Sequence, residues 1–247
     1  ANAERLAVDL ASIEAVFLSH WHSDHSGGFP RVIAAIAQAR AAAGLPAPLV
    51  DLHPDRPDQR GLMTATGTLL LLGPEPTFGE LEAAGGVLVK AGEAHVVRDF
   101  FYGSGAIPRV TAYETGLAGH HSFRDGRLES DPLILDERFL AARVRGRGVS
   151  VLSACSHAGI VNACLGARDA FPGVPIDVVL GGYHLAGKIM EQRIDETTRD
   201  LAALVAPRIV APGHCTGWRA KAALANRFAP GRYAPSVVGS LYRLVAH

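Results

Sequence analysis

The apolar and polar positions of the chain repeat one arrangement four times: a short apolar run, a turn that carries a histidine, and then apolar residues at helical spacing. The first apolar run covers residues 15–19 and ends at His20, and helical spacing follows over residues 31–43. The other three runs, residues 149–152, 177–180 and 208–211, lead to His157, His184 and His214. Because short apolar runs that alternate with helices are typical of strand–helix units, the pattern predicts a layered α/β fold.

After each histidine turn, apolar residues recur every three or four positions, as on one face of a helix. After His184, the apolar face of such a helix is expected to carry Ile194, Leu201, Leu204 and Val205. Ligands in layered α/β folds bind where loops leave the carboxyl ends of strands. The four histidines are therefore expected to lie together at one edge.

Residues 60–140 have a different pattern, in which glycine, proline and aspartate interrupt short apolar runs. Strands are expected at residues 67–72, 86–89 and 100–102. Residues 116–126 are glycine-rich and polar, which is typical of a surface or active-site loop. No internal repeat or linker-like segment divides the chain, so we expect one domain over residues 1–247.

Composition and charge narrow the class of partner. Of the 247 residues, 48% are hydrophobic and 19% are charged, which is a globular balance. Lys and Arg together number 24, as do Asp and Glu, and the resulting net charge of zero disfavours nucleic acid and anionic membranes as partners. No apolar run approaches the roughly 20 residues of a membrane-spanning helix, and the N-terminal residues are too charged for a secretory signal. We expect a soluble, cytoplasmic protein that acts on a small molecule, with its oligomeric state left open.

The chain has 11 histidines, and the segment after the first apolar run concentrates them. His20, His22, Asp24 and His25 place three imidazoles and a carboxylate within one short turn. Without an ion, such a cluster would carry repulsion and desolvation costs with no compensation. Two divalent ions about 3.5–4 Å apart need many converging ligands, so this segment predicts part of a two-metal site that distant strand ends complete.

The spacing His20-x-His22-x-Asp24-His25 resembles the HxHxDH motif of the metallo-β-lactamase superfamily. The segments CSHAGI at 155–160, GGYHL at 181–185 and GHCTG at 213–217 resemble blocks of one subgroup, related to the dihydropterin aminobenzene-phosphate synthase of methanopterin biosynthesis. The resemblance extends from about residue 10 to residue 244 and implies an αββα sandwich. Only 19 residues precede His20, so we expect some N-terminal strands of that sandwich to be missing.

The resemblance also implies a metal-dependent hydrolase with two divalent ions, zinc first, with manganese and iron as alternatives that suit histidine and carboxylate ligands. A metal-activated water would be the nucleophile, and Asp24 would accept a hydrogen bond from it. The implied ligands are His20, His22 and His157 for the first ion and Asp24, His25 and His214 for the second.

One position departs from the superfamily pattern. An aspartate usually bridges the two ions at the end of the third strand unit, and this chain has Gly181-Gly182 there. His184 follows two residues after Gly182, so on a strand its side chain would point to the same side. Three roles for His184 follow: a metal ligand, a group that supports a ligand, or a catalytic contact to the substrate.

Substrate-binding residues have a weaker basis in the sequence. Cationic and imidazole side chains that would bind a phosphate or carboxylate are Arg109, His120, His121 and Lys188. They favour a phosphoester over a lactone. Two alternatives to a hydrolase remain: a synthase that joins a pterin to a ribosyl aminobenzene phosphate, and a non-catalytic metal-binding or sensing protein.

The three cysteines, Cys155, Cys164 and Cys215, are widely spaced and odd in number, which indicates reduced thiols. Cys155 and Cys215 flank the histidines of the second and fourth units. We expect these two to be small packing residues.

Overall fold

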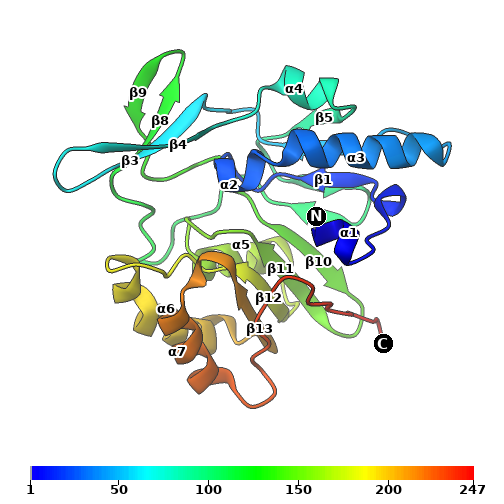
Figure 1. Cartoon of the computed structure of the whole chain (residues 1–247). Helices are drawn as coiled ribbons and strands as arrows, with labels where there is room; N and C mark the ends of the chain where they lie inside the picture. Colours follow the sequence, from blue (N-terminus) through cyan, green and yellow to red (C-terminus); the bar gives the residue numbers. More distant parts are fainter. Residues whose placement is uncertain (1) are drawn as a thin grey trace. The chain divides into compact units, whose positions relative to one another are not determined.

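The computed structural model describes residues 2–247, which divide into two compact units (Figure 1). Unit 1 comprises residues 2–93 and 117–132, and unit 2 comprises residues 94–116 and 133–247. Both units combine sheets with helices, which confirms the predicted mixed α/β class. No helix among these residues is long and apolar enough to cross a membrane.

Unit 1 begins with the short helices α1 (Asn2–Arg5) and η1 (Leu10–Ser12) and contains a parallel sheet of order β1-β2-β5. The segment at 15–19 forms β1 (Ala15–Phe17), which pairs with β2 (Leu49–Leu52), and β2 pairs with β5 (Val87–Lys90). The predicted helix at 31–43 is α3 (Phe29–Ala42), and α4 (Phe78–Ala83) precedes β5. Both helices contribute to one apolar core, which contains Leu18, Trp21, Ile33, Val50, Leu52 and Leu81.

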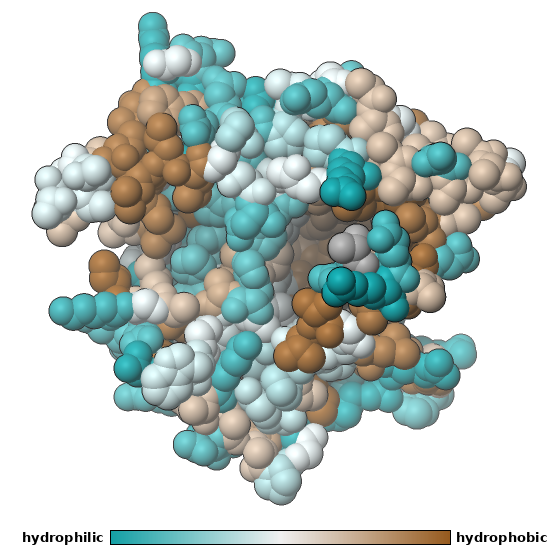
Figure 2. Space-filling view, viewed as in Figure 1, coloured by the Kyte–Doolittle hydropathy of each residue, from teal (hydrophilic) through white to brown (hydrophobic). Residues whose placement is uncertain are grey.

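A second sheet in unit 1 is antiparallel and has the order β4-β3-β8-β9. Its strands are β3 (Gln59–Met63), β4 (Leu69–Pro74), β8 (His120–Arg124) and β9 (Arg127–Ser130). Figure 2 shows an apolar patch on this sheet, where Leu70, Leu71 and Leu128 are exposed.

The prediction of a loop throughout 116–126 was wrong, because residues 120–124 form β8. β8 and β9 are joined by Asp125 and Gly126, whose φ angles of 50° and 74° suit a two-residue hairpin turn. The Asp-Gly pair was therefore the local signal for a hairpin.

Unit 2 contains one sheet of order β13-β12-β11-β10-β7-β6. Its strands are β6 (His95–Val97), β7 (Phe101–Gly103), β10 (Leu140–Val144), β11 (Gly148–Ser153), β12 (Ile176–Gly182) and β13 (Ile209–Gly213). β11, β12 and β13 are mutually parallel neighbours, as the strand–histidine–helix pattern predicts, and the other pairings are antiparallel.

The helices of unit 2 follow the three parallel strands. α5 (Ile160–Ala170) follows β11, α6 (Ile194–Asp200) follows β12 after the turn η2 (Met190–Arg193), and α7 (Trp218–Phe228) follows β13 and the turn η4 (His214–Thr216). The prediction that Leu204 belongs to the apolar face was wrong, because half of its surface is exposed. It lies in η3 (Leu201–Val205), a π-helical turn whose wider winding changes the phase of the helix.

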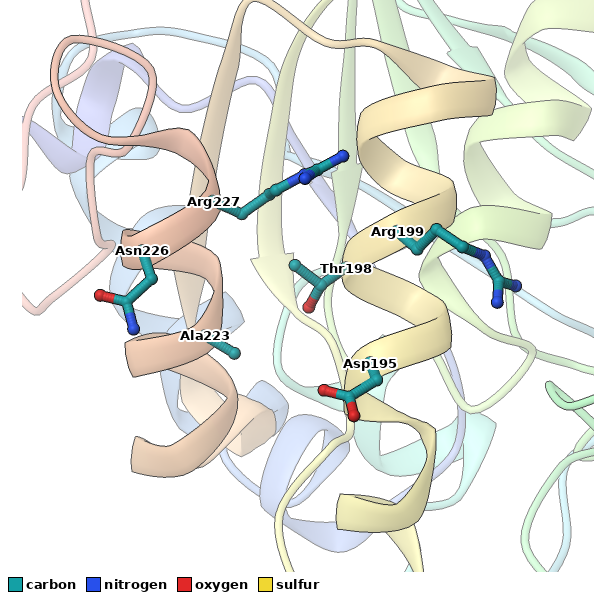
Figure 3. A pocket seen from close by; sticks show the side chains of 6 residues that line it. All are labelled: Asp195, Thr198, Arg199, Ala223, Asn226 and Arg227. Carbon is teal, nitrogen blue, oxygen red and sulfur yellow. The ribbon is translucent and has the colours of Figure 1, made fainter.

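A shallow groove of about 340 Å³ separates α6 from α7 (Figure 3). The residues that line it are Asp195, Thr198, Arg199, Ala223, Asn226 and Arg227. None of these six residues is a histidine or cysteine, so this groove is not the candidate metal site.

An ion-pair cluster secures the start of β12. The buried carboxylate of Asp177 accepts hydrogen bonds from Nε of Arg147, at 3.1 Å, and from Nε of Arg208. Burial acts to raise the pKa of Asp177, but the hydrogen bonds and charges of Arg208 and Arg147 outweigh it, so the pKa lies below its ordinary value.

We expect Asp177→Asn to lower the free energy of unfolding by about 1–3 kcal/mol at neutral pH, because charged hydrogen bonds to a buried group are lost. A carboxyl group with a depressed folded pKa stabilises the protein above its unfolded pKa, and this contribution disappears as the pH falls through the folded value. Denaturant melts should therefore show the difference from wild type shrinking below about pH 4. Asp169→Asn, on the exposed face of α5, is the control, and a pH-independent difference would contradict the assignment.

Candidate metal centre

In unit 1, the chain leaves β1 and brings His20, His22, Asp24 and His25 together. The ring centroid of His20 lies 4.8 Å from that of His22 and 4.4 Å from that of His25. His20 and His22 are buried, whereas the Asp24 side chain is 60% exposed. Oδ2 of Asp24 lies 3.5 Å from Nε2 of His25. The short helix α2 (Ser23–Ser26) begins directly after His22 and brings His25 beside His20 and Asp24 beside His25.

Hydrogen bonds determine which nitrogen of His22 would face an ion. Nδ1 of His120 lies 2.7 Å from the carbonyl oxygen of Asp131, which can only accept, so this nitrogen carries the proton. Nε2 of a neutral His120 is then an acceptor, and Nε2 of His22 donates to it at 2.9 Å. The lone pair of a neutral His22 is therefore on Nδ1. Nδ1 of His20 is likewise engaged, by Ser19 Oγ at 2.9 Å, so Nε2 is the nitrogen of His20 that would face an ion.

In unit 2, His157, His184 and His214 follow the carboxyl ends of three adjacent parallel strands, as predicted. His20 follows β1, a strand of the separate sheet in unit 1. The rings of His157 and His184 lie 4.3 Å apart between centroids. His184 and His214 have φ angles of 45° and 40°, in the left-handed region that non-glycine residues rarely adopt. Such backbone strain, about 1–3 kcal/mol for each residue, is concentrated at functional sites.

Glu137 holds His157 and was not among the predicted residues. Its Oε1 accepts hydrogen bonds from the backbone N–H of His157 at 2.8 Å and from Nδ1 at 2.9 Å, and its Oε2 accepts from the N–H of Ala158 at 2.6 Å. Burial acts to raise the pKa of Glu137, but the imidazole and these N–H groups outweigh it and lower the pKa to about 2. Because a carboxylate accepts at Nδ1, the lone pair of a neutral His157 is on Nε2.

The sequence contains one sign of this arrangement. Asp136, Glu137 and Arg138 are consecutive charged residues between apolar neighbours, and all three are almost fully buried. Buried charges need partners, so such a triplet before a strand indicates an internal polar network. It does not indicate which histidine the network supports.

The two glycines at the end of β12 leave little space for a larger side chain. A Cβ added at Gly182 would lie 2.7 Å from Sγ of Cys215 and 2.5 Å from the carbonyl oxygen of Ala154. Sγ of Cys215 lies 3.5 Å from Sγ of Cys155. The hydrogen bond to Cys155, together with the nearby imidazoles, outweighs burial and lowers the pKa of the Cys215 thiol to about 4. The Cys215 thiol and the backbone of Ala154 and Cys155 occupy the space that an aspartate at Gly182 would require.

The predicted substrate contacts lie in different surroundings. Arg109 donates to the carbonyl oxygens of His157, at 3.2 Å, and Leu133, so its guanidinium supports the loop of His157, and burial lowers its pKa. His120 is fully buried against His22. His121 is half-buried, with Nδ1 2.9 Å from the carbonyl oxygen of Gly119, and Lys188 is exposed.

The family model of the metallo-beta-lactamase superfamily matches residues 1–184, about three quarters of the chain. The chain belongs to this superfamily, as its HxHxDH segment predicts. It is 27% identical over 223 residues to the 7,8-dihydropterin-6-methyl-4-(beta-D-ribofuranosyl)-aminobenzene-5'-phosphate synthase of Methanocaldococcus jannaschii, covering 89% of this chain and 72% of the synthase. It also resembles the crystal structure of a metal-dependent hydrolase of the beta-lactamase superfamily, with a TM-score of 0.77, 23% identity, and coverage of 98% of this chain and 83% of that one. The fold is therefore that of the superfamily.

Proposed function

We propose that the protein is a metal-dependent hydrolase with a dinuclear site. His20, His22 and His157 would hold the first ion, and Asp24, His25 and His214 the second. The main support is that each histidine assigned to the first ion has one ring nitrogen held by a hydrogen bond. His20 is held by Ser19, His22 by His120, and His157 by Glu137. Ligand histidines in metalloproteins are typically oriented in this way, so the donor atoms suit divalent ions such as zinc, manganese or iron.

Two divalent ions, when bound, would supply an acidified water as the nucleophile and would stabilise the charge that develops on the substrate. The chain's own residues do the rest. His120 and Glu137 hold the rings of His22 and His157 in one tautomer. The Asp24 carboxylate, which is largely exposed, would orient the attacking water by accepting a hydrogen bond from it.

The substrate we favour is an ester, with a phosphoester ahead of a lactone. Lys188 and His121 would provide partners for an anionic group, while Arg109 and His120 support ligand histidines in addition to any contact with substrate. A second candidate is a synthase or transferase reaction on a pterin and a ribosyl aminobenzene phosphate. The similarity to the archaeal synthase favours it.

Metal analysis of the purified chain tests the proposal most directly. We expect about two equivalents of divalent metal per chain, zinc first, after purification or after reconstitution. A folded protein that contains no metal and cannot be loaded would contradict the assignment. Loaded protein should then be assayed with phosphodiesters, phosphomonoesters and lactones, and separately with pterin donors. Loaded protein without turnover in any assay would favour the binding or sensing alternative.

His184→Ala is expected to lower the metal content from two ions toward one. The Nδ1 atom of His184 is buried and has no hydrogen-bond partner within residues 2–247, and its donor atom lies within 4.8 Å of those of Cys155 and His157. An imidazole in this position suits a ligand role. Elemental analysis alongside kinetics separates the roles, because a substrate contact would leave both ions bound and change only KM or kcat.

A further inference from the structure

Two thiols in unit 2 have no role in the proposed hydrolysis. Cys155 follows β11 and Cys215 follows β13, and their sulfur atoms are 3.5 Å apart. Gly182 allows this approach, since any Cβ there would contact Sγ of Cys215. Cys164 differs, because it is fully buried in the apolar core of the unit, where burial raises its pKa. Cys155 and Cys215 lie outside that core, among imidazoles.

The charge of the proposed ligand set is unbalanced. Five neutral imidazoles and the carboxylate of Asp24 offer one negative charge to two dications. Uncompensated positive charge weakens ion binding, and thiolates are anionic ligands that zinc binds well. Cys155 and Cys215 place two sulfur donors, which are anionic once bound to zinc as thiolates, beside His214.

We propose that Cys155 and Cys215, together with His214, bind a thiophilic divalent ion such as zinc as thiolates. This inference rests on the proposed function in that His214 is already assigned to the second ion. The donor atoms of the three residues all lie within 4.8 Å of one another. Two adjacent Zn–S bonds of about 2.3 Å separate their sulfur atoms by about 3.3–4.0 Å, so Sγ of Cys155 and Sγ of Cys215, 3.5 Å apart, are already near the required spacing.

X-ray absorption at the zinc edge tests the proposal on the whole wild-type chain, without a variant. We expect a sulfur shell at about 2.3 Å from zinc. The measurement averages over both ions, so two thiolates on one of them correspond to about one sulfur per zinc. Substitution with cobalt should produce a thiolate-to-cobalt charge-transfer band in the near ultraviolet. Scattering from nitrogen and oxygen alone, in protein loaded with two ions, would overturn the inference.

Single-residue variants then identify which cysteines supply the sulfur ligands. Cys155→Ser and Cys215→Ser should each weaken the charge-transfer band and lower zinc affinity at least about tenfold, measured by competition with a chelator. Cys164→Ser is the matched control and should keep the charge-transfer band and the zinc affinity of the wild-type chain. Unchanged affinity and an unchanged band in both ligand variants would overturn the inference while leaving the dinuclear hydrolase intact. A chain that binds no metal at all would instead contradict the proposed function as well.

Discussion

His22→Ala and Asp24→Ala are each expected to reduce hydrolysis of a responsive ester probe by about a hundred- to a thousandfold or more, because each removes a ligand from the proposed dinuclear site. Their effects on stability should differ. Asp24 is largely exposed, so its loss should change the free energy of unfolding by about 0.5 kcal/mol or less. His22 is buried and hydrogen-bonded to His120, so its replacement should lower the free energy of unfolding by about 1–3 kcal/mol.

Metal content, turnover and denaturant melts measured on the same preparations check this expectation. Glu82→Ala, an exposed acidic residue on α4, serves as the control for Asp24→Ala and should retain metal and activity. Wild-type turnover in either ligand variant would place the chemistry elsewhere. If the Asp24→Ala variant keeps two ions but loses turnover, Asp24 orients the attacking water and is not a required metal ligand.

Sequence patterns predicted two kinds of element well: a helix with one buried face, and short strands that are buried on both faces. The helix expected at 31–43 is observed at Phe29–Ala42, and the three strands of the last units coincide with β11, β12 and β13. β8 was missed for a physical reason. Its buried positions are His120 and Ser122, so the strand has no alternation of apolar and polar residues, and its inward side chains are satisfied by hydrogen bonds.

In the candidate site, residues that are adjacent in sequence could be predicted, and partners that are distant in sequence could not. The residues from His20 to His25 are adjacent in sequence, so their chemistry is visible in a single segment. The residues that orient the rings are not adjacent: His120 is 98 positions from His22, and Glu137 is 20 positions from His157. Their contacts depend on strand pairing and on the loop after β11, which no spacing rule describes. His120 was accordingly predicted as a substrate contact, although its ring is bonded to His22.

Glu137→Gln is expected to lower metal affinity by about 10–100-fold, the usual effect of removing a partner that orients a ligand histidine. All three groups around the carboxylate are donors: the N–H and Nδ1 of His157 and the N–H of Ala158. An amide presents one oxygen and one NH₂ group, so it would set a donor against a donor in a buried site. With its oxygen at the Oε2 position, the amide would leave Nδ1 and the N–H of His157 without an acceptor; with its oxygen at the Oε1 position, it would leave the N–H of Ala158 without one. In either orientation, the loop that positions the His157 ring loses a hydrogen bond.

A cycle with His157→Ala distinguishes positioning from general destabilisation. If Glu137 acts through the imidazole, Glu137→Gln should lower metal affinity in the wild-type chain but have little further effect once His157 is alanine. Glu129→Gln, an exposed glutamate on β9, is the control and should leave affinity unchanged. Equal losses of metal affinity with and without the His157 imidazole would contradict the positioning role, because Glu137 would then act through the backbone of the loop alone.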